Sequence, residues 1–107
     1  PFDHRVSFLI DTARNVRKAI PDSMPLMVRL SCTDWVEGGW TIEDTVTLVR
    51  ELRTLGCDFA DISSGGSSLA AKVPLAPGYQ VPFAERVRRE AASYLTACGL
   101  AMRRFVQ

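Results

Sequence analysis

Hydrophobic and polar positions alternate with two different periods along the chain, and the change between the two periods predicts an α/β fold. In the first segment, apolar residues recur every three or four positions, which is typical of an amphipathic helix. We expect this helix to begin after Asp3, as its N-cap, and to end at Pro21. Its apolar positions are Val6, Leu9, Ile10, Ala13, Val16 and Ile20. The next apolar run, residues 26–31, is short and continuous, as expected of a strand buried on both faces.

The helix and strand patterns then repeat. Thr41 and Asp44 have the spacing of a capping box, and the apolar stripe that follows them predicts a helix ending at Gly56. The remaining expected elements are a strand over 57–63, a helix over about 83–92 and a short strand over 94–98. A long loop containing prolines separates the second strand from the last helix.

The three predicted strands begin near Leu26, Asp58 and Tyr94, a spacing that matches one β-α unit of a barrel or of a doubly wound sheet. Three parallel strands with uncovered edges make a poor independent domain, because their apolar faces and unpaired backbone groups need neighbouring strands. The chain is therefore expected to be a slice of a larger domain. If that domain is a barrel, its chemistry belongs at the carboxyl ends of the strands, around residues 29–32, 63–66 and 98–99.

Composition places this chain of 107 residues among globular proteins, with 47% hydrophobic residues and a net charge of +1. The near balance of 13 Lys and Arg against 12 Asp and Glu provides no overall field for nucleic acid or for a membrane surface. No apolar run has the length of a membrane helix. The 3 cysteines form no C-x-x-C pair, so a disulfide framework is not expected, and a reducing, cytoplasmic compartment fits best.

Arg29 is the main candidate for chemistry, because it interrupts the apolar run of the first predicted strand. A guanidinium buried there needs an anionic or hydrogen-bonding partner, since an unpaired buried charge is strongly unfavourable. One candidate partner is Asp61 on the second predicted strand, which would make Arg29 half of a salt bridge. The other is a ligand, and the residues themselves leave both interpretations open.

Other polar and aromatic residues have structural interpretations. His4 is the only histidine and has no Cys or carboxylate at ligand spacing, so no metal site is expected. Trp35 and Trp40 lie in the loop after the first strand, where packing is favoured over contact with a substrate. Ser63 and Ser64 have no partner base, so neither is expected to be a nucleophile.

Five segments of the chain, taken in order, resemble motifs of one enzyme family. They are Val28-Arg29-Leu30-Ser31, Asp34-Trp35, Gly38-Gly39, Asp61-Ile62-Ser63-Ser64-Gly65-Gly66 and Pro77-Gly78-Tyr79-Gln80-Val81-Pro82-Phe83-Ala84-Glu85-Arg86. Together they resemble the old yellow enzyme family of FMN-dependent NADH:flavin oxidoreductases, and most closely its thermophilic-like bacterial branch. The similarity runs over about residues 2–91, whereas residues 92–107 diverge. The resemblance implies that residues 1–107 are a fragment of a single FMN-binding domain.

The family has a TIM (β/α)₈ barrel fold with the cofactor across its C-terminal mouth, so the resemblance implies a partial barrel of about three consecutive β-α units. It implies that Arg29 contacts the pyrimidine side of FMN, where the reduced ring carries negative charge. It also implies that Gly99 is the strand-end glycine of the phosphate loop, although the spacing from Thr96 is one residue shorter than in the family. No catalytic residue is assigned, because the family's substrate-orienting histidine and proton-donating tyrosine lie on a preceding strand without a counterpart here.

The function implied by this resemblance is that of part of an FMN-dependent NAD(P)H dehydrogenase that reduces activated alkenes, an ene-reductase. Its expected partners are NAD(P)H as reductant and a small enone or alkene as substrate, with neither nucleic acid nor membrane, and the full-length protein is expected to be a homo-oligomer. The isolated fragment is expected to be inactive. Two alternatives stay open: a truncated, non-catalytic product, and a different TIM-barrel enzyme with a phosphate-bearing ligand.

Overall fold

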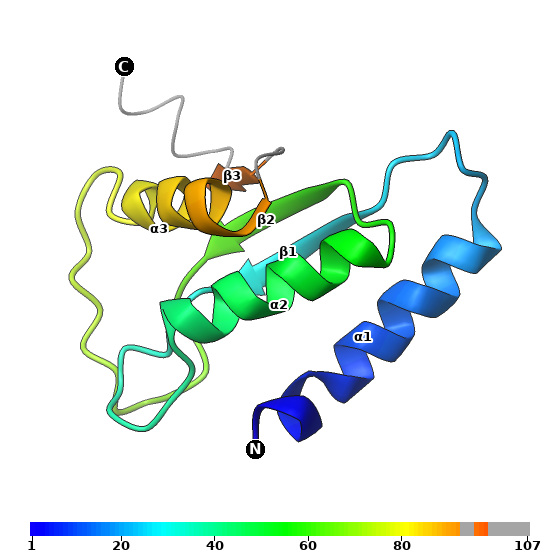
Figure 1. Cartoon of the computed structure of the whole chain (residues 1–107). Helices are drawn as coiled ribbons and strands as arrows, with labels where there is room; N and C mark the ends of the chain where they lie inside the picture. The colour runs from blue at the N-terminus through cyan, green and yellow to red at the C-terminus, as the bar shows by residue number, and fades with distance from the viewer. Residues whose placement is uncertain (93–95, 99–107) are drawn as a thin grey trace.

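Parallel strands joined by helices form the part of the chain that the computed structural model describes, residues 1–92 and 96–98 (Figure 1). The elements, in chain order, are α1 (Phe2–Ala19), β1 (Met27–Ser31), α2 (Ile42–Thr54), β2 (Phe59–Ser63), α3 (Val81–Val87), the π-helical turn η1 (Arg88–Ala92) and β3 (Thr96–Cys98). The sheet has the order β1-β2-β3, and both strand pairs are parallel. The predicted α/β class with consecutive parallel strands is confirmed.

The register of the sheet fixes which side chains share a face. In the β1–β2 pair, Met27 lies beside Phe59, and Arg29 lies beside Asp61. Because successive residues of a strand point to opposite faces, these four residues lie on one face of the sheet. The residues between them, such as Leu30 on β1, lie on the other face.

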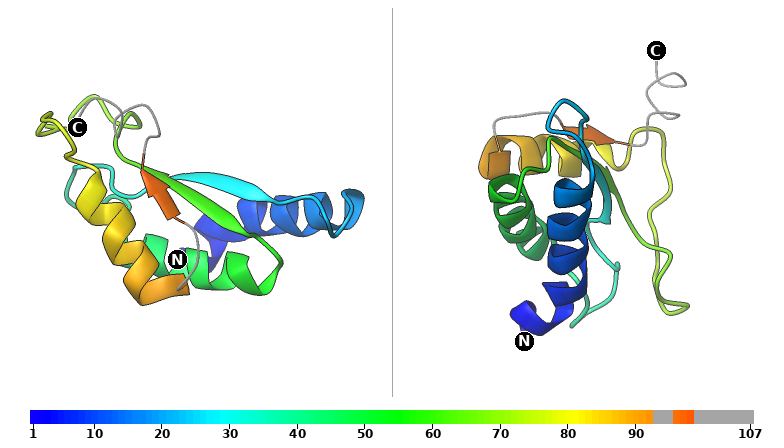
Figure 2. Two further views of the ribbon diagram at one scale, coloured as in Figure 1. Left: turned by 90° about the horizontal axis from the view of Figure 1, so that it is seen from above. Right: turned by 90° about the vertical axis from the view of Figure 1, so that its right-hand side faces the viewer.

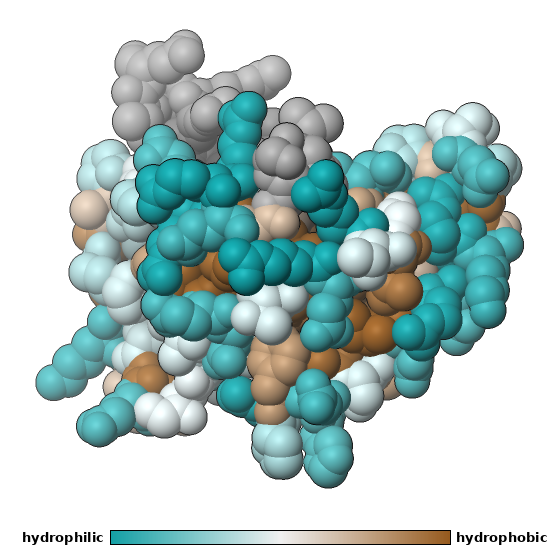
Figure 3. Space-filling view, viewed as in Figure 1, coloured by the Kyte–Doolittle hydropathy of each residue, from teal (hydrophilic) through white to brown (hydrophobic). Residues whose placement is uncertain are grey.

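All three helices cover the face that carries Leu30 and Ile62, while the loop from β2 to α3 extends away from them (Figure 2). The core forms between these helices and the sheet. Its largest fully buried apolar side chains are Leu52, Ile62, Val49 and Val87. Hydrophobic side chains also gather between α1 and α2 (Figure 3), where Val6 and Ala13 of α1 are buried. Burial of these apolar side chains is the main term that stabilises the helices on the sheet.

The ends of α2 follow the sequence prediction. The Thr41 side chain accepts a hydrogen bond from the Asp44 backbone at 3.2 Å, and the Asp44 carboxylate accepts one from the Thr41 backbone at 3.2 Å. This reciprocal pair is the predicted capping box. At the other end, Gly56 has φ +93°, a left-handed conformation in which glycine is not strained.

The ends of α1 and α3 differ from the prediction. The prediction of Asp3 as the N-cap is wrong, because α1 already begins at Phe2. Asp3 instead lies in the first turn of the helix, where the helix dipole stabilises a negative charge. The predicted last helix begins earlier, at Val81, where Pro82 suits a first turn that needs no backbone donor. Its second half is the π-helical turn η1.

Within the described residues, none of the helices has the length and apolar character needed to cross a membrane. The description of residues 1–107 as a fragment of one domain stays a prediction.

Candidate functional site

The face of the sheet turned away from the helices carries the candidate site. Side chains of alternate residues lie there in three rows, with Met27 beside Phe59, Arg29 beside Asp61 and, nearest the carboxyl ends of the strands, Ser31 beside Ser63. No described helix packs on this face (Figure 2), and Met27 is 58% exposed. The site is therefore an open surface whose central row carries both charges.

Arg29 and Asp61 form a salt bridge between Nη1 and Oδ2. The pairing is one of the two predicted partnerships of Arg29, but the predicted burial of its guanidinium is wrong. The Arg29 side chain is 61% exposed, whereas that of Asp61 is 9% exposed. An apolar sequence around a strand residue indicates burial only when both faces of the sheet are covered, and here the described residues cover one. The pair thus gives a nearly buried carboxylate that anchors an exposed cation.

Backbone hydrogen bonds fix the two loops that leave β1 and β2 side by side at the carboxyl end of the sheet. The Cys32 N–H donates to the Ser63 carbonyl at 2.8 Å, and the Gly65 N–H donates to the Thr33 carbonyl at 2.8 Å. The Ser31 hydroxyl donates to the Gly65 carbonyl at 3.3 Å. The hydrogen-bonded backbone therefore continues past the ends of the two strands, next to the row formed by Ser31 and Ser63.

Two glycines follow β2 in left-handed conformations, Gly65 with φ +72° and Gly66 with φ +89°. A Cβ at Gly65 would lie 3.3 Å from Cδ1 of Trp35, whereas a Cβ at Gly66 would meet no heavy atom of the described residues within 4 Å. Gly66 therefore exposes backbone that a ligand can approach closely.

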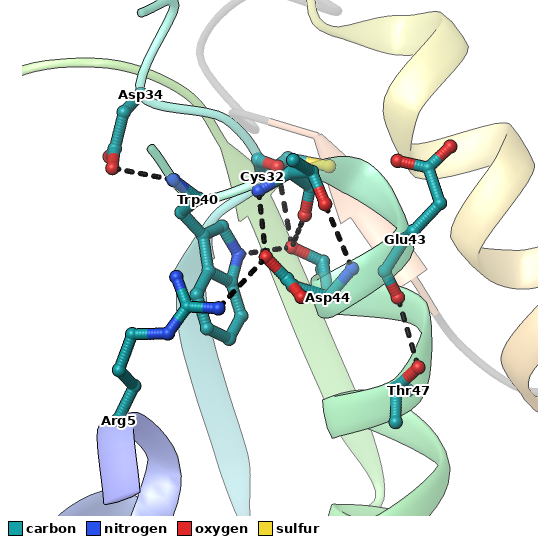
Figure 4. Close-up of polar contacts among 9 residues, drawn as sticks. Arg5, Cys32, Asp34, Trp40, Glu43, Asp44 and Thr47 are labelled. Carbon is teal, nitrogen blue, oxygen red and sulfur yellow. Dashed lines mark hydrogen bonds and ion pairs between the residues drawn. The ribbon is translucent and has the colours of Figure 1, made fainter. Parts of the chain in front are cut away.

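The loop from β1 to α2 is held by its own polar contacts (Figure 4). The Asp34 carboxylate accepts from the Trp40 backbone N–H at 2.9 Å, and the indole N–H of Trp40 donates to the Thr45 hydroxyl at 2.7 Å. The guanidinium of Arg5 lies 5.2 Å from the Trp40 ring and 3.5 Å from a carboxylate oxygen of Asp44. Trp40 thus packs the loop against α1 and α2, in agreement with the packing interpretation.

Trp35 packs in the same manner on the loop that precedes α3. Its ring lies edge-on to Phe83 at 5.5 Å between centroids and 6.5 Å from the Tyr79 ring. The Tyr79 hydroxyl accepts from the Gln80 side chain at 2.8 Å, and this amide also lies 3.2 Å from the Ser64 hydroxyl. Through these contacts Tyr79 holds the shape of this loop. The bridging role of Gln80 was not predicted, although its place in the Pro-Gly-Tyr-Gln motif was the available signal.

The amino end of the sheet carries a second Arg–Asp pair with a different environment. Arg17 donates from Nη2 to the carbonyls of Pro21, at 2.6 Å, and Met24, at 2.9 Å, and its Nη1 lies 3.4 Å from Oδ2 of Asp58. Here the arginine is the less exposed partner, with 17% exposure against 55% for the aspartate. Desolvation, and then the Asp58 charge, raise the pKa of the nearby Cys57 thiol, which favours its neutral form.

Two other sequence predictions concern metal and phosphate binding. His4 is exposed on α1, and the described residues contain no group of three His, Cys, Asp or Glu side chains that could hold a metal ion. Gly99, the predicted phosphate-loop glycine, lies outside the described residues. Its role and the flavin contact of Arg29 stay predictions.

Comparison with known proteins gives a consistent set of relatives, although no family model matches. An NADPH dehydrogenase of Geobacillus thermodenitrificans is 40% identical over 97 residues, which are 91% of this chain and 27% of the relative. An NADPH dehydrogenase of Geobacillus sp. (strain WCH70) is 41% identical over 101 residues, 92% of this chain and 28% of the relative. An NADPH dehydrogenase of Listeria monocytogenes (strain EGD-e) is 38% identical over 103 residues, which are 96% of this chain and 30% of the relative. The chain thus spans less than a third of the length of these relatives.

Proposed function

Because this chain is homologous to one segment of the NADPH dehydrogenases, relatives of the old yellow enzyme type, we propose that it is the flavin-contacting central segment of an FMN-dependent NAD(P)H oxidoreductase. The names of the relatives support an oxidoreductase that uses NADPH. FMN, the alkene substrate and the barrel are the finer parts of the proposal. The geometry of the open face supports FMN and the barrel, and the resemblance to the old yellow enzyme family supports the alkene.

The arrangement of the elements supports a partial (β/α)₈ barrel. Consecutive strands lie next to each other in the order β1-β2-β3, all parallel, and the helices lie on one face (Figure 1). In a barrel the helices form the outer ring and the opposite face of the strands lines the interior. The row of Arg29 and Asp61 would then face the interior, and the loops after Ser31 and Ser63 would belong to the C-terminal mouth.

The observation that carries the proposal is the exposed guanidinium of Arg29 on this open face. Arginine has five N–H donors in a rigid fork, and the salt bridge to Asp61 engages Nη1. The other donors suit the pyrimidine edge of a flavin, which carries carbonyl acceptors and becomes anionic on reduction. In the loop after β2, the backbone of Gly66 is accessible to a ligand. The residues present therefore fit a flavin.

When bound, FMN would carry hydride equivalents from NAD(P)H to an activated alkene such as an enone. Arg29 would bind and orient the ring edge and provide a fixed positive charge there. The loops after β1 and β2 would hold the rim of the site in place through the Cys32–Ser63 and Gly65–Thr33 hydrogen bonds. Proton donation and substrate orientation are assigned to none of the residues of this chain.

The test of this proposal is a graft. In the Geobacillus thermodenitrificans NADPH dehydrogenase, the 97-residue segment aligned with this chain is exchanged for the corresponding residues of this chain. We expect this grafted enzyme to purify yellow, with FMN bound, and to oxidise NADPH in the presence of an enone above the rate of free FMN. The unmodified dehydrogenase and the same enzyme with the segment deleted are the positive and negative controls. A folded graft that is colourless at saturating FMN contradicts the proposal, as does a graft that the barrel does not accept at all.

A further inference from the structure

The Arg29–Asp61 pair is asymmetric in a way that indicates a function for the aspartate. Asp61 lies in the centre of β2 with 9% of its side chain exposed, so its carboxylate has a fixed position. Arg29 is 61% exposed and has a long side chain with many rotamers. Since one partner is fixed and the other adaptable, the carboxylate determines where the guanidinium lies.

The neighbours on the open face leave the carboxylate well placed for this role. Toward the carboxyl ends of the strands, the Ser63 hydroxyl donates to the Leu30 carbonyl at 3.3 Å, and the Ser31 hydroxyl donates to the Gly65 carbonyl at 3.3 Å. Toward the amino ends, the adjoining row is the apolar pair Met27 and Phe59. Both serine protons are thus directed at backbone carbonyls, so neither serine hydroxyl competes with Arg29 for Asp61.

We propose that Asp61 is a positioning residue that holds the Arg29 guanidinium by Nη1 and so presents its remaining donors to an anionic ligand on the open face of the sheet. The proposal rests on the proposed function, in which this ligand is the pyrimidine edge of FMN. Asp61 acts through Arg29 and needs no contact with the flavin. Without this anchor the guanidinium samples many rotamers, and each ligand contact must offset the cost of ordering it.

Charge and position predict opposite effects, which makes the proposal testable. Removing the Asp61 charge increases the net positive field at the open face, so a purely electrostatic role predicts tighter FMN binding and easier flavin reduction. Loss of positioning predicts weaker binding and harder reduction, because the guanidinium no longer meets the ring in one geometry. The sign of the change in FMN affinity and in flavin potential therefore separates an electrostatic role of Asp61 from a positioning role.

The chain offers a matched control in the Arg17–Asp58 pair, which joins the same two types of residue at the amino end of the sheet. Asp58 also accepts from the backbone N–H of Leu26 at 2.9 Å, so its loss should lower stability. It lies far from the carboxyl ends of the strands and is not part of the proposed flavin site. A general loss of stability should therefore appear in Asp58→Asn, without an effect on the flavin.

The experiment compares Asp61→Asn, Asp61→Glu and Asp58→Asn in the grafted enzyme, with and without Arg29→Leu. We measure the FMN dissociation constant, the flavin midpoint potential and the melting temperature of the FMN-free protein. For Asp61→Asn we expect FMN binding to weaken about tenfold, the size expected from one charge-assisted hydrogen bond, with a more negative potential. Asp61→Glu should restore part of the affinity. In the Arg29→Leu background, Asp61→Asn should change FMN affinity by less than about twofold, because Asp61 acts through the arginine.

Three results would overturn the positioning role while leaving the proposed function intact: unchanged or tighter FMN binding in Asp61→Asn, an equal loss in Asp58→Asn, or an undiminished effect in the Arg29→Leu background. A graft that binds no FMN before any substitution overturns the proposed function, and the positioning role with it. If Asp61→Asn does not fold, Asp61→Glu takes its place, because glutamate keeps the charge and moves its position. FMN binding weaker than in the parent graft then supports the positioning role, and unchanged or tighter FMN binding overturns it.

Discussion

At the scale of single residues, the open face pairs a nearly buried carboxylate, that of Asp61, with the exposed guanidinium of Arg29. The sequence offered the Arg29–Asp61 pairing as one of two partnerships for Arg29, the other being a ligand, because charges in apolar strand runs need partners. The exposure of Arg29 did not follow, since the covering of each sheet face depends on elements far apart in the sequence. The bridging of Ser64 and Tyr79 by Gln80 was also missed, because a loop hydrogen bond has no periodic signal.

A residue-scale prediction concerns Gly56, which follows the C-cap of α2 with φ +93° and lies beside Arg17. A Cβ at this position would lie 2.7 Å from Cδ of Arg17. Gly56→Ala should therefore displace the arginine from its carbonyl acceptors in addition to the left-handed backbone cost of about 1–2 kcal/mol. The control is Gly38→Ala, also left-handed at φ +76°, where a Cβ would meet no heavy atom within 4 Å in the part of the chain that the structure describes. Melting temperatures of the two variants in the grafted enzyme should fall further for Gly56→Ala, and an equal decrease would contradict the account of Arg17.

At the scale of elements, helix and strand types were predicted well because their periods are local properties of the sequence. The capping box of α2 and its end at Gly56 were predicted because both depend on residues within one turn. The start of α1 was placed too late, since a first turn without a side-chain cap leaves little signal. The change from α3 to the π-helical turn η1 could not be predicted, because neither proline nor glycine occurs at the transition.

An element-scale prediction concerns the ion pair that joins α2 to α3, in which Nη2 of Arg86 lies 2.9 Å from Oε1 of Glu43. A backbone hydrogen bond at Glu43, and next the Arg86 guanidinium, hold the pKa of the Glu43 carboxyl below its usual value. A carboxyl whose pKa is lowered on folding stabilises the fold above its unfolded pKa of about 4.3, and this contribution is lost as the pH falls through the lower folded pKa.

Glu43→Gln should therefore lower the melting temperature of the grafted enzyme at pH 7 by a small amount, and the difference from the parent should shrink as the solution is acidified below about pH 4. Glu51→Gln is the control, since Glu51 lies on the same helix and forms no side-chain ion pair among the described residues. A difference for Glu43→Gln that stays constant with pH would contradict the ion-pair assignment.

At the scale of the whole molecule, parallel strands of suitable spacing predicted a slice of a larger sheet, and the homologous segment of longer relatives agrees with this. The described residues do not determine how that sheet closes, and the barrel is proposed from the strand order and the relatives. The exposed side chains are consistent with missing neighbours, since Phe8 on α1 is 84% exposed and Met27 on the open face is 58% exposed.

The isolated chain of 107 residues should therefore be only marginally stable, and it should oligomerise or aggregate through its open face and strand edges. Light scattering and thermal unfolding test this directly. A monomer with one sharp cooperative transition would favour a self-contained α/β domain instead.

The isolated chain should also fail to oxidise NADPH with an enone when FMN is added, because under the proposed function flavin binding and substrate orientation need segments of the relatives that this chain does not span. The measurement is steady-state NADPH oxidation coupled to alkene reduction, with free FMN as the control. Turnover above that control would show that the open face suffices by itself.

We propose that Arg29 binds a flavin in addition to Asp61, and the flavin midpoint potential of Arg29→Leu in the grafted enzyme, measured beside its melting temperature, tests this directly. The account predicts weaker FMN retention and a more negative potential, since a charge-assisted contact of about 1.5–3 kcal/mol is lost at the anionic edge of the ring, with partial recovery in Arg29→Lys. If Arg29 serves only the salt bridge, removing it leaves Asp61 nearly buried without this partner, and stability should fall while the flavin potential stays unchanged. An unchanged flavin midpoint potential together with a lowered melting temperature would contradict the role of Arg29 in flavin binding.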